Sequence, residues 1–337
     1  MIGDLYIDGK DAYSKYGVCI LDGGYAELVA MPQLKTITTN DWQEEDGVEA
    51  DLSEPVLDTR NIQLKVSADN RDSRYFTLIE LLSDGAYHTF EVLNIGRTFR
   101  LRLASVTVSS YIMDFALLTM KFADDFPLDG YTYQEPVSTL PTDDSYAIDG
   151  RPTTDYNVRV LKGTLSEVVR TPEVKANLLR NIKTVSGAIY DPKVVTYKSK
   201  DVKVYCLMTA EDTKTLWRNW NALLYDLVRP DERLLWVDSL EQEFPCYYKS
   251  CSVTEFYCEN KIWLKFTLTL TFTRDFRLSD DDIVLATEDS KIVYTEDDKY
   301  AIEMLRGGSV DKTLRLVSKQ SLRFTSQGYS RFNDITI

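Results

Sequence analysis

The sequence has very little histidine, few cysteines and no long apolar run. Among 337 residues there is one histidine, His88, and five cysteines, none of them in a Cys-x-x-Cys pair. Because zinc sites need several nitrogen or sulfur ligands, we expect neither a metal nor a cofactor. No apolar stretch approaches the roughly 18 residues of a membrane-spanning helix, so we expect no membrane contact. A lone histidine in a turn before a strand is typical of an ordinary surface residue, and we expect this of His88.

Positive charge is also in short supply. Lysine and arginine total 39 against 53 aspartates and glutamates, which gives a net charge of −14. A polyanion is repelled by such a surface, so sequence-specific reading of DNA or RNA is disfavoured. The first eight residues lack the charged and apolar regions of a secretion signal, so we expect folding in a cytoplasm with reduced cysteines.

Catalytic motifs are missing as well. The sequence has no glycine-rich phosphate loop and no Gly-x-Ser-x-Gly turn, and we expect no enzyme. Paired carboxylates such as Glu44-Glu45 are what glycosidases use, but 53 acidic residues produce neighbours by chance. The 21 tyrosines and five tryptophans could present a sugar-binding platform, although Trp217 and Trp220 fit a core or an interface better.

What the sequence does contain is a repeat. Tyr6-Ile-Asp-Gly-Lys10 returns as Ala147-Ile-Asp-Gly-Arg151, and Tyr16-Gly-Val18 returns 140 positions later as Tyr156-Asn-Val158. Pro32 and Lys35 return as Pro172 and Lys175 at the same offset. Copies of this length indicate two related domains rather than a solenoid. We expect one copy in residues 1–130, a linker in 131–145, a second copy in 146–278 and a small β-rich segment in 279–337.

The residue patterns predict a mainly β (α+β) fold, with one helix in each copy. Helices are expected over residues 71–83 and 211–227, where apolar residues recur at helical spacing. Strands are expected where β-branched and aromatic residues alternate with polar ones. In the first copy these strands are 5–7, 18–21, 25–39, 61–68, 89–93, 98–103, 106–113 and 115–122. In the second copy they are 158–161, 165–169, 202–207, 234–237, 244–248, 252–257 and 262–272, and short strands are expected at 283–285, 291–294, 314–317 and 321–324.

One segment differs in charge between the copies. Residues 41–60 carry eight acidic residues against Arg60, whereas residues 176–200 carry five basic residues against Asp191. Drift of charge in solvated loops would explain this, but so would a charge-complementary contact between neighbouring domains of a closed ring. For such a contact the candidate residues are Glu44, Glu45, Asp46, Glu49, Asp51, Arg180, Lys183, Lys193, Lys198 and Lys200.

The opening of each copy, Ile-Asp-Gly followed by Tyr16-Gly-Val18, resembles the start of the distal tail proteins of long-tailed bacteriophages. The order of strands, long hairpin, single helix and closing strands is similar to the tail-tube fold, which tube, distal tail and baseplate hub proteins share. Two fused domains look closer to a hub, in which duplicated domains form a trimeric ring, than to a hexameric distal tail protein.

The resemblance implies a structural protein of a phage or prophage tail, assembled in the host cytoplasm. Its ring would join the tail tube to the host-recognition baseplate, bind other tail proteins, and let DNA pass without specific binding. A carbohydrate-binding or adhesin-like protein remains an alternative, as does a glycoside hydrolase. The former predicts a monomer with exposed coplanar aromatics, and the latter a cleft with one raised carboxyl pKa.

Overall fold

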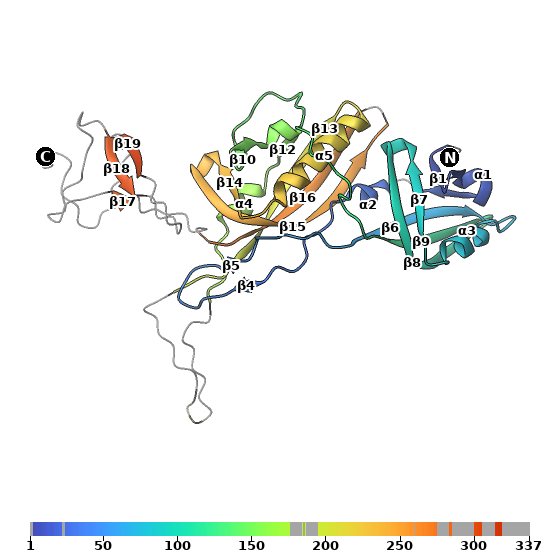
Figure 1. Cartoon of the computed structure of the whole chain (residues 1–337), viewed down its shortest axis with the longest axis horizontal. Helices are drawn as coiled ribbons and strands as arrows, with labels where there is room; N and C mark the ends of the chain where they lie inside the picture. The colour runs from blue at the N-terminus through green and yellow to red at the C-terminus, as the bar shows by residue number, and fades with distance from the viewer. Residues whose placement is uncertain are drawn as a thin grey trace, which may run out of the picture. The chain divides into compact units, whose positions relative to one another are not determined.

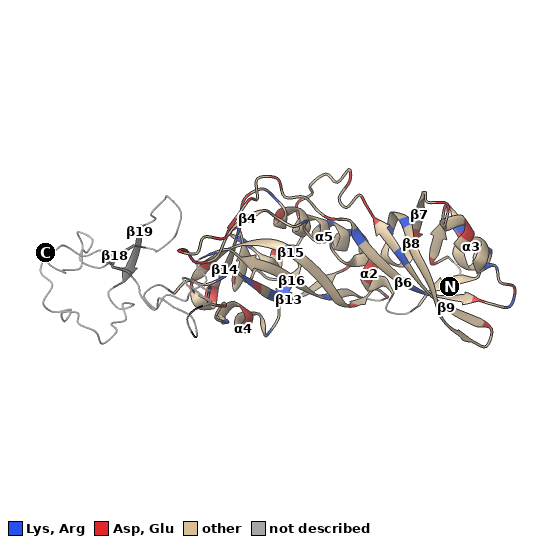
Figure 2. Ribbon diagram, turned by 90° about the horizontal axis from the view of Figure 1, so that it is seen from below, with Lys and Arg blue, Asp and Glu red and all other residues tan. Residues whose placement is uncertain are grey.

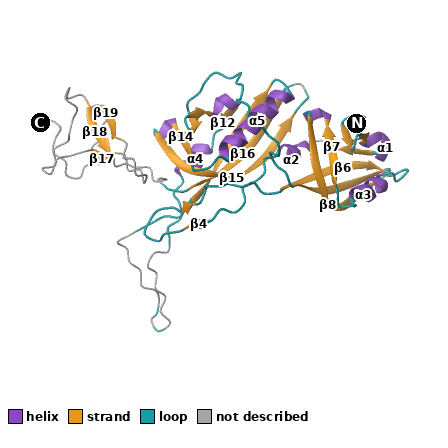
Figure 3. Cartoon of the chain, viewed as in Figure 1, coloured by secondary structure: helices purple, strands orange, loops and turns teal. Residues whose placement is uncertain are grey.

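The chain was analysed as a computed structural model, which describes residues 3–21, 24–175, 184, 186, 195–259 and 261–274. Beyond these it describes the backbone of residues 283–284, 300–304 and 314–318. The chain divides into two compact units, Met1–Arg274 and Asp275–Ile337. The first unit holds two seven-stranded antiparallel sheets with few helices, so the expectation of a mainly β fold is confirmed (Figures 1 and 3).

The first sheet is built from the N-terminal part of the chain. Its strands, in spatial order, are β2 (Lys10–Asp11), β1 (Leu5–Ile7), β7 (Tyr87–Val92), β8 (Arg97–Ile112), β9 (Phe115–Asp124), β6 (Arg60–Asp69) and β3 (Val18–Ile20). Its helices are α1 (Ala12–Tyr16), α2 (Tyr25–Val29), α3 (Tyr75–Leu82) and the 3-10 turn η1 (Leu93–Ile95). Strand β6 buries every second residue, which places one of its faces in the core.

The second sheet repeats this order, strand for strand. Its strands are β11 (Arg151–Pro152), β10 (Tyr146–Ile148), β14 (Arg233–Val237), β15 (Gln242–Tyr257), β16 (Ile262–Phe272), β13 (Lys200–Ala210) and β12 (Val158–Val160). Its helices are the 3-10 turn η2 (Thr153–Tyr156), α4 (Thr164–Val169), α5 (Thr213–Leu227) and the 3-10 turn η3 (Asp238–Leu240). The element order of one sheet therefore maps onto that of the other.

Helix α5 shows why its sequence folds as it does. Asp212 is its N-cap, and the Asp212 side chain accepts a hydrogen bond of 2.6 Å from the Thr215 N–H. The predicted apolar stripe is buried on one side of the helix, which lies across the second sheet in Figure 1: Leu216, Trp220, Leu223 and Leu227. The predicted helix is thus confirmed, with its start two residues later than expected.

Two of the expected strands are short helices instead. Residues 25–29 and 165–169 read as strands because they contain β-branched and aromatic residues, but they fold as α2 and α4. The reason is tertiary: buried cations donate hydrogen bonds to the carbonyl groups at the end of each helix. Arg60 donates to the carbonyl oxygens of Leu28 and Ala30, at 2.8 and 2.9 Å. These contacts satisfy carbonyls that a helix end leaves unpaired, and local propensity does not reveal them.

Two pairs of expected strands are single long strands. Residues 98–103 and 106–112 belong to β8, with residue 113 of the expected strand in the following turn, and residues 244–248 and 252–257 belong to β15. Each long strand changes register with its partner at two places, which are β-bulges. A bulge interrupts the alternation of polar and apolar residues and so makes one strand look like two.

The hairpins of the two sheets end differently. The turn between β8 and β9 exposes large apolar side chains, with Met113 94% and Tyr111 58% exposed. The matching turn between β15 and β16 carries the exposed charged residues Glu259 and Lys261. A further short hairpin, β4 (Thr39–Asn40) with β5 (Glu49–Ala50), lies outside both sheets.

The second unit contains a three-stranded antiparallel sheet in the order β17 (Ile283–Val284), β18 (Tyr300–Met304) and β19 (Leu314–Ser318). The strands expected at 283–285 and 314–317 correspond to β17 and β19. Those expected at 291–294 and 321–324 lie outside the described residues.

Candidate functional site

The β4–β5 hairpin follows three strands and two helices of the first copy, β1, β2, α1, β3 and α2, yet it is bound by residues of the second sheet's copy. Lys175 holds it: its Nζ donates to the carbonyl oxygens of Trp42 and Gly47, at 2.6 and 2.7 Å, and pairs with the Asp41 carboxylate at 2.6 Å. The Lys175 side chain is only 2% exposed. A buried ammonium with three oxygen partners is fully hydrogen-bonded, so this contact fixes the hairpin in place.

Backbone contacts complete this clasp, by which we mean the β4–β5 hairpin together with the residues that bind it. The Gly47 and Val48 N–H groups donate to the carbonyl oxygens of Tyr197 and Thr273, at 2.7 and 2.8 Å. In return, the Tyr197 N–H donates to the Asp46 carboxylate at 2.8 Å. Gly47 has a φ of +75°, and a Cβ there would lie 1.6 Å from the Thr273 carbonyl oxygen. Only glycine fits this position.

Helix α5 joins the two sheets at a second place. Its Trp217 indole N–H donates to the Ile95 carbonyl oxygen at 2.6 Å, and the Trp220 indole N–H donates to the Val29 carbonyl oxygen at 2.9 Å. Both carbonyls belong to the first sheet's copy. The expectation that Trp217 and Trp220 are core or interface residues is confirmed, because both rings are buried where the two copies meet.

A half-buried arginine lies beside these tryptophans. The Arg97 guanidinium is 4.0 Å from the centre of the Trp217 ring and 3.3 Å from the Asn221 side-chain oxygen. Burial, together with the neighbouring Arg60 charge, lowers the pKa of Arg97 to about 10, and Asp124 opposes this shift. A cation that is desolvated over an indole ring contributes cation–π attraction to the junction.

The predicted contact residues are dispersed. Asp46 binds the Tyr197 N–H across the clasp, whereas Glu49 accepts bonds from Asn40 and Trp42 within the hairpin, at 3.4 and 3.3 Å. The Asp51 carboxylate accepts a hydrogen bond from the Ser53 N–H, and Glu44 and Glu45 are exposed. Figure 2 shows acidic residues in red near β4. Three of the basic candidates lie outside the described residues: Arg180, Lys183 and Lys193.

The other two basic candidates have different environments. Lys198 is exposed and pairs with Glu173 at 3.1 Å. Lys200 is buried, and its Nζ donates to the carbonyl oxygens of Val168 and Arg170 at the end of α4. Burial, with the nearby Arg170 charge, lowers the pKa of Lys200 to about 8. An acidic residue at position 200 would face these carbonyls, so reversing its charge would unfold the sheet rather than test an interface.

Sequence reasoning missed most of the clasp. Lys175 stood out as the repeat of Lys35, but nothing in the sequence places its side chain against the other copy's hairpin. Thr196 donates its hydroxyl to the Gln43 carbonyl oxygen at 2.8 Å, and Thr273 offers its backbone carbonyl. Contacts to backbone atoms leave no residue-type signal, so the acidic pattern of residues 41–60 contained Asp41 and Asp46 of the clasp but not its backbone contacts.

His88 is not the surface residue that its sequence context predicts. It lies within β7 and is 5% exposed, with Nδ1 2.7 Å from an Asp8 carboxylate oxygen and Nε2 3.1 Å from one of Asp84. Burial alone would lower the pKa of His88, but the hydrogen bonds to the two carboxylates raise it above its ordinary value. The imidazole replaces Arg233, which pairs with Asp149 at 2.7 Å in the second sheet.

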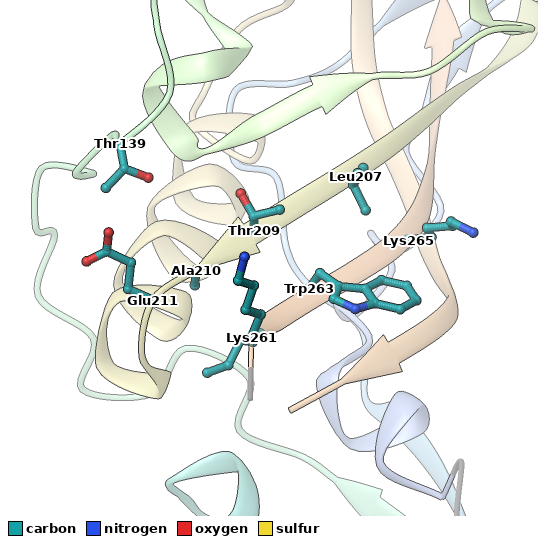
Figure 4. Close-up of a pocket in the computed structure, with 9 residues that line it drawn as sticks. Thr139, Leu207, Thr209, Ala210, Glu211, Lys261, Trp263 and Lys265 are labelled. Atoms are coloured by element: carbon teal, nitrogen blue, oxygen red, sulfur yellow. The ribbon is translucent and has the colours of Figure 1, made fainter. Parts of the chain in front are cut away.

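A surface pocket of about 680 Å³ lies where β13 ends and β16 begins (Figure 4). Leu207, Ala210 and Trp263 line it together with Glu211 and Lys261. Trp263 stacks on Tyr257, with ring centres 6.1 Å apart and planes 23° apart. The pocket therefore combines an aromatic wall with two charged side chains.

Within the described ranges, no group of three histidine, cysteine or acidic side chains is arranged to hold a metal ion. No helix among the described residues is long and apolar enough to cross a membrane. The five cysteines are free, and Cys206 and Cys246 are buried in strands.

No protein-family model matches the chain, and no curated protein sequence matches it. Among solved structures, the chain is similar to the crystal structure of the Dit protein (gp 19.1) of SPP1, described as a paradigm of the hub adsorption apparatus in phages that infect Gram-positive bacteria. The two are 12% identical, the similarity covers 80% of this chain and 98% of that one, and the TM-score is 0.29. A likeness at this TM-score carries no argument about function.

Proposed function

We propose that the protein is a structural component of a bacteriophage or prophage tail. Its chains form a ring at the distal end of the tail tube and connect the tube to the host-recognition baseplate. A ring of three or six chains has the tail tube, baseplate and receptor-binding proteins as neighbours. The proposal places the protein in the virion tail, after assembly in the cytoplasm of the bacterial host.

The observation that carries the proposal is the clasp between two sheets of one strand order. Two like units are joined head to tail: the hairpin of the first copy is bound at the base of the second. Contacts of this heterologous kind generate closed rings when the rotation between units closes. The chain therefore contains, within itself, one example of the contact from which a ring of such units can be built.

The chain's charge fits the passage of DNA through such a ring. With a net charge of −14, its surface repels a polyanion at long range and offers little for phosphates to bind. DNA can therefore slide past without being held, and no chemistry on the DNA is required.

Light scattering and negative-stain electron microscopy of the purified full chain test the proposal, together with immunogold labelling of tail particles. We expect a ring of three or six chains with a central hole, and label at the distal end of the tail. Particles that lack the chain, or a chain that stays monomeric when mixed with tail-tube and baseplate proteins, would contradict the proposal.

A carbohydrate-binding role is the second candidate, because Trp263 lines the pocket beside β16 and its ring also stacks on Tyr257. Aromatic faces of this kind bind the apolar faces of sugars. A glycan array with the wild-type chain and with Trp263→Ala tests it: glycan binding by the wild type that the variant loses would support this role, and an array with no binding would remove it.

A further inference from the structure

The backbone contacts at the foot of the segment that carries the β4–β5 hairpin have an equivalent in the second copy, and we call each of these two sets of contacts a base. In each copy, an antiparallel bridge and a neighbouring backbone hydrogen bond tie the two ends of a long segment together. The bonds from Lys35 to Val56 and from Lys175 to Thr196 are 2.9 and 2.8 Å long. The equivalent bridges, each 140 positions apart, are Leu34–Leu57 and Val174–Tyr197.

The second base is covered, and the first is not. In the second base, the hairpin of the first copy leaves Lys175 2% and Thr196 4% exposed. In the first base, Lys35 is exposed and Val56 is 53% exposed. Among the described residues, the Lys35 ammonium has no hydrogen-bond or ion-pair partner. The first base thus has the bridge and the lysine of the second, with Val56 in place of Thr196. Its Leu34 N–H donates to the Lys249 carbonyl oxygen at 3.0 Å, which leaves the Lys35 side of the base exposed.

The sequence contains a segment that matches this base. In the sequence, residues 176–194 follow Lys175 as residues 36–54, which include the β4–β5 hairpin, follow Lys35; nearly all of residues 176–194 lie outside the described residues. Gly187 lies 140 positions after Gly47, whose missing side chain lets the hairpin approach the Thr273 carbonyl. The strand register shows which residue of the first copy corresponds to Thr273. Arg60 pairs with Asp124 as Lys200 pairs with Phe272, so Asp125, directly after β9, is the equivalent of Thr273.

Charge favours the same pairing. Residues 176–194 contain Arg180, Lys183 and Lys193 against Asp191. The surroundings of the first base are acidic, with Glu54 and Asp58 beside Leu57 in the chain. Opposite charges steer the correct surfaces together and repel like ones.

We propose that the first base, formed by Lys35, Val56 and Leu57, binds residues 176–194 of a second copy of this chain. The contact repeats between chains the clasp that exists within one chain. It rests on the proposed function for its ring closure, and it names the surface through which the ring closes. Every chain then donates one segment and receives one, so the contact is head to tail.

Two single variants test the two sides of the contact in the full chain. Lys35→Met removes the ammonium donor of the receiving base, with Lys15→Met, at an exposed lysine on α1, as its control. Gly187→Val alters the donated segment, with Gly85→Val as its control, since nothing lies within 4 Å of a Cβ at Gly85. Loss of charge-assisted hydrogen bonds predicts at least a roughly tenfold rise in the concentration at half-assembly. Circular dichroism melting confirms that each variant is folded.

Mixing the two variants gives the sharper result. A Lys35→Met chain still has an intact segment, and a Gly187→Val chain still has an intact base. An equal mixture should therefore form a dimer of two 38.7 kDa chains, visible in light scattering, while each variant alone stays monomeric. A contact with the same surface on both chains would not be rescued by mixing.

The outcomes separate this inference from the proposed function. Rings that persist in both variants, or a mixture that stays monomeric, overturn the inference and leave a tail role standing. A wild-type chain that never self-associates also overturns it. Head-to-tail dimers from a chain that is absent from tail particles would support the contact and overturn the tail role.

Discussion

Arg60 and Lys200 occupy the same position in the two sheets. Both bind the carbonyl groups at a helix end, but their other partners differ. Each donates to carbonyl groups at the end of a short helix, α2 or α4. Arg60 also pairs with Asp124 at 2.7 Å, whereas the Lys200 ammonium lies 5.5 Å from the centre of the Phe272 ring. A buried cation without a carboxylate partner is less stable in its charged form, which explains the lowered pKa of Lys200.

His88 makes stability depend on pH. Its pKa is raised in the folded state because protonated imidazole bonds Asp8 and Asp84. The resulting stabilisation is complete below the ordinary pKa of about 6.5 and is lost as the pH rises through the folded-state value. We expect His88→Gln to lower the free energy of unfolding more at about pH 5.5 than at about pH 8.5. Urea unfolding at both pH values measures this, and a difference that stays constant or grows with pH would contradict it.

Gly47 should tolerate a side chain less well than another glycine of the same conformation. Gly47→Ala and its control Gly85→Ala both place a side chain at positive φ, +75° and +80°, at a cost of about 1 kcal/mol each. Only at Gly47 does the new Cβ meet a carbonyl oxygen, so we expect a further ~1–3 kcal/mol or a detached hairpin. Urea unfolding and hydrogen exchange of residues 39–50 distinguish these two results. Equal costs at both positions would show that the hairpin does not approach Thr273 closely.

At the scale of elements, the β4–β5 hairpin depends on the other copy for its place. Its two strands are two residues each, which is too short for a hairpin to be stable alone. The clasp supplies what the strands lack, through Lys175 and the backbone of Tyr197 and Thr273. The hairpin is therefore an arm of the first copy that is folded against the second.

Removing the Lys175 ammonium should release this arm. Lys175→Met leaves the Trp42 and Gly47 carbonyls and the Asp41 carboxylate without their donor, and we expect a loss of about 2 kcal/mol or more. The control Lys198→Met removes an exposed pair with Glu173 and should cost about 0–1 kcal/mol. Limited proteolysis within residues 39–50 and urea unfolding measure both effects. A hairpin equally protected in the two variants would show that Lys175 does not hold it.

Which elements the sequence could predict follows from where their information lies. Helix α5 and strand β16 were predictable because their apolar residues recur at the period of the element. Helices α2 and α4 were not, since buried cations far away in the chain stabilise their ends. Strands β8 and β15 were each predicted as two strands, because their bulges break the alternation of polar and apolar residues. The clasp was hidden because most of its contacts go to backbone atoms.

At the scale of the molecule, the repeat was the most reliable signal. Matching segments 140 positions apart indicated two related copies, and the two sheets have one strand order. The contact predicted from the charge contrast between residues 41–60 and 176–200 stays a prediction; of the candidate residues that the structure describes, Asp46 contacts the other copy. A pattern of charge can locate a surface without identifying the atoms that bind.

The two hairpin tips differ, and this has a consequence for the number of neighbours. The β8–β9 tip exposes Tyr111, Ile112 and Met113, whereas the β15–β16 tip carries Glu259 and Lys261. In a ring of alternating copies, apolar β8–β9 tips and charged β15–β16 tips would alternate around the ring. A partner protein that binds the apolar tips would then be present once per chain. The ring would therefore bind half as many partner molecules as it has seven-stranded sheets. Native mass spectrometry of the ring with a bound baseplate protein would count it, and one partner per sheet would refute this stoichiometry. Duplication would thus have allowed one ring to present two kinds of binding site.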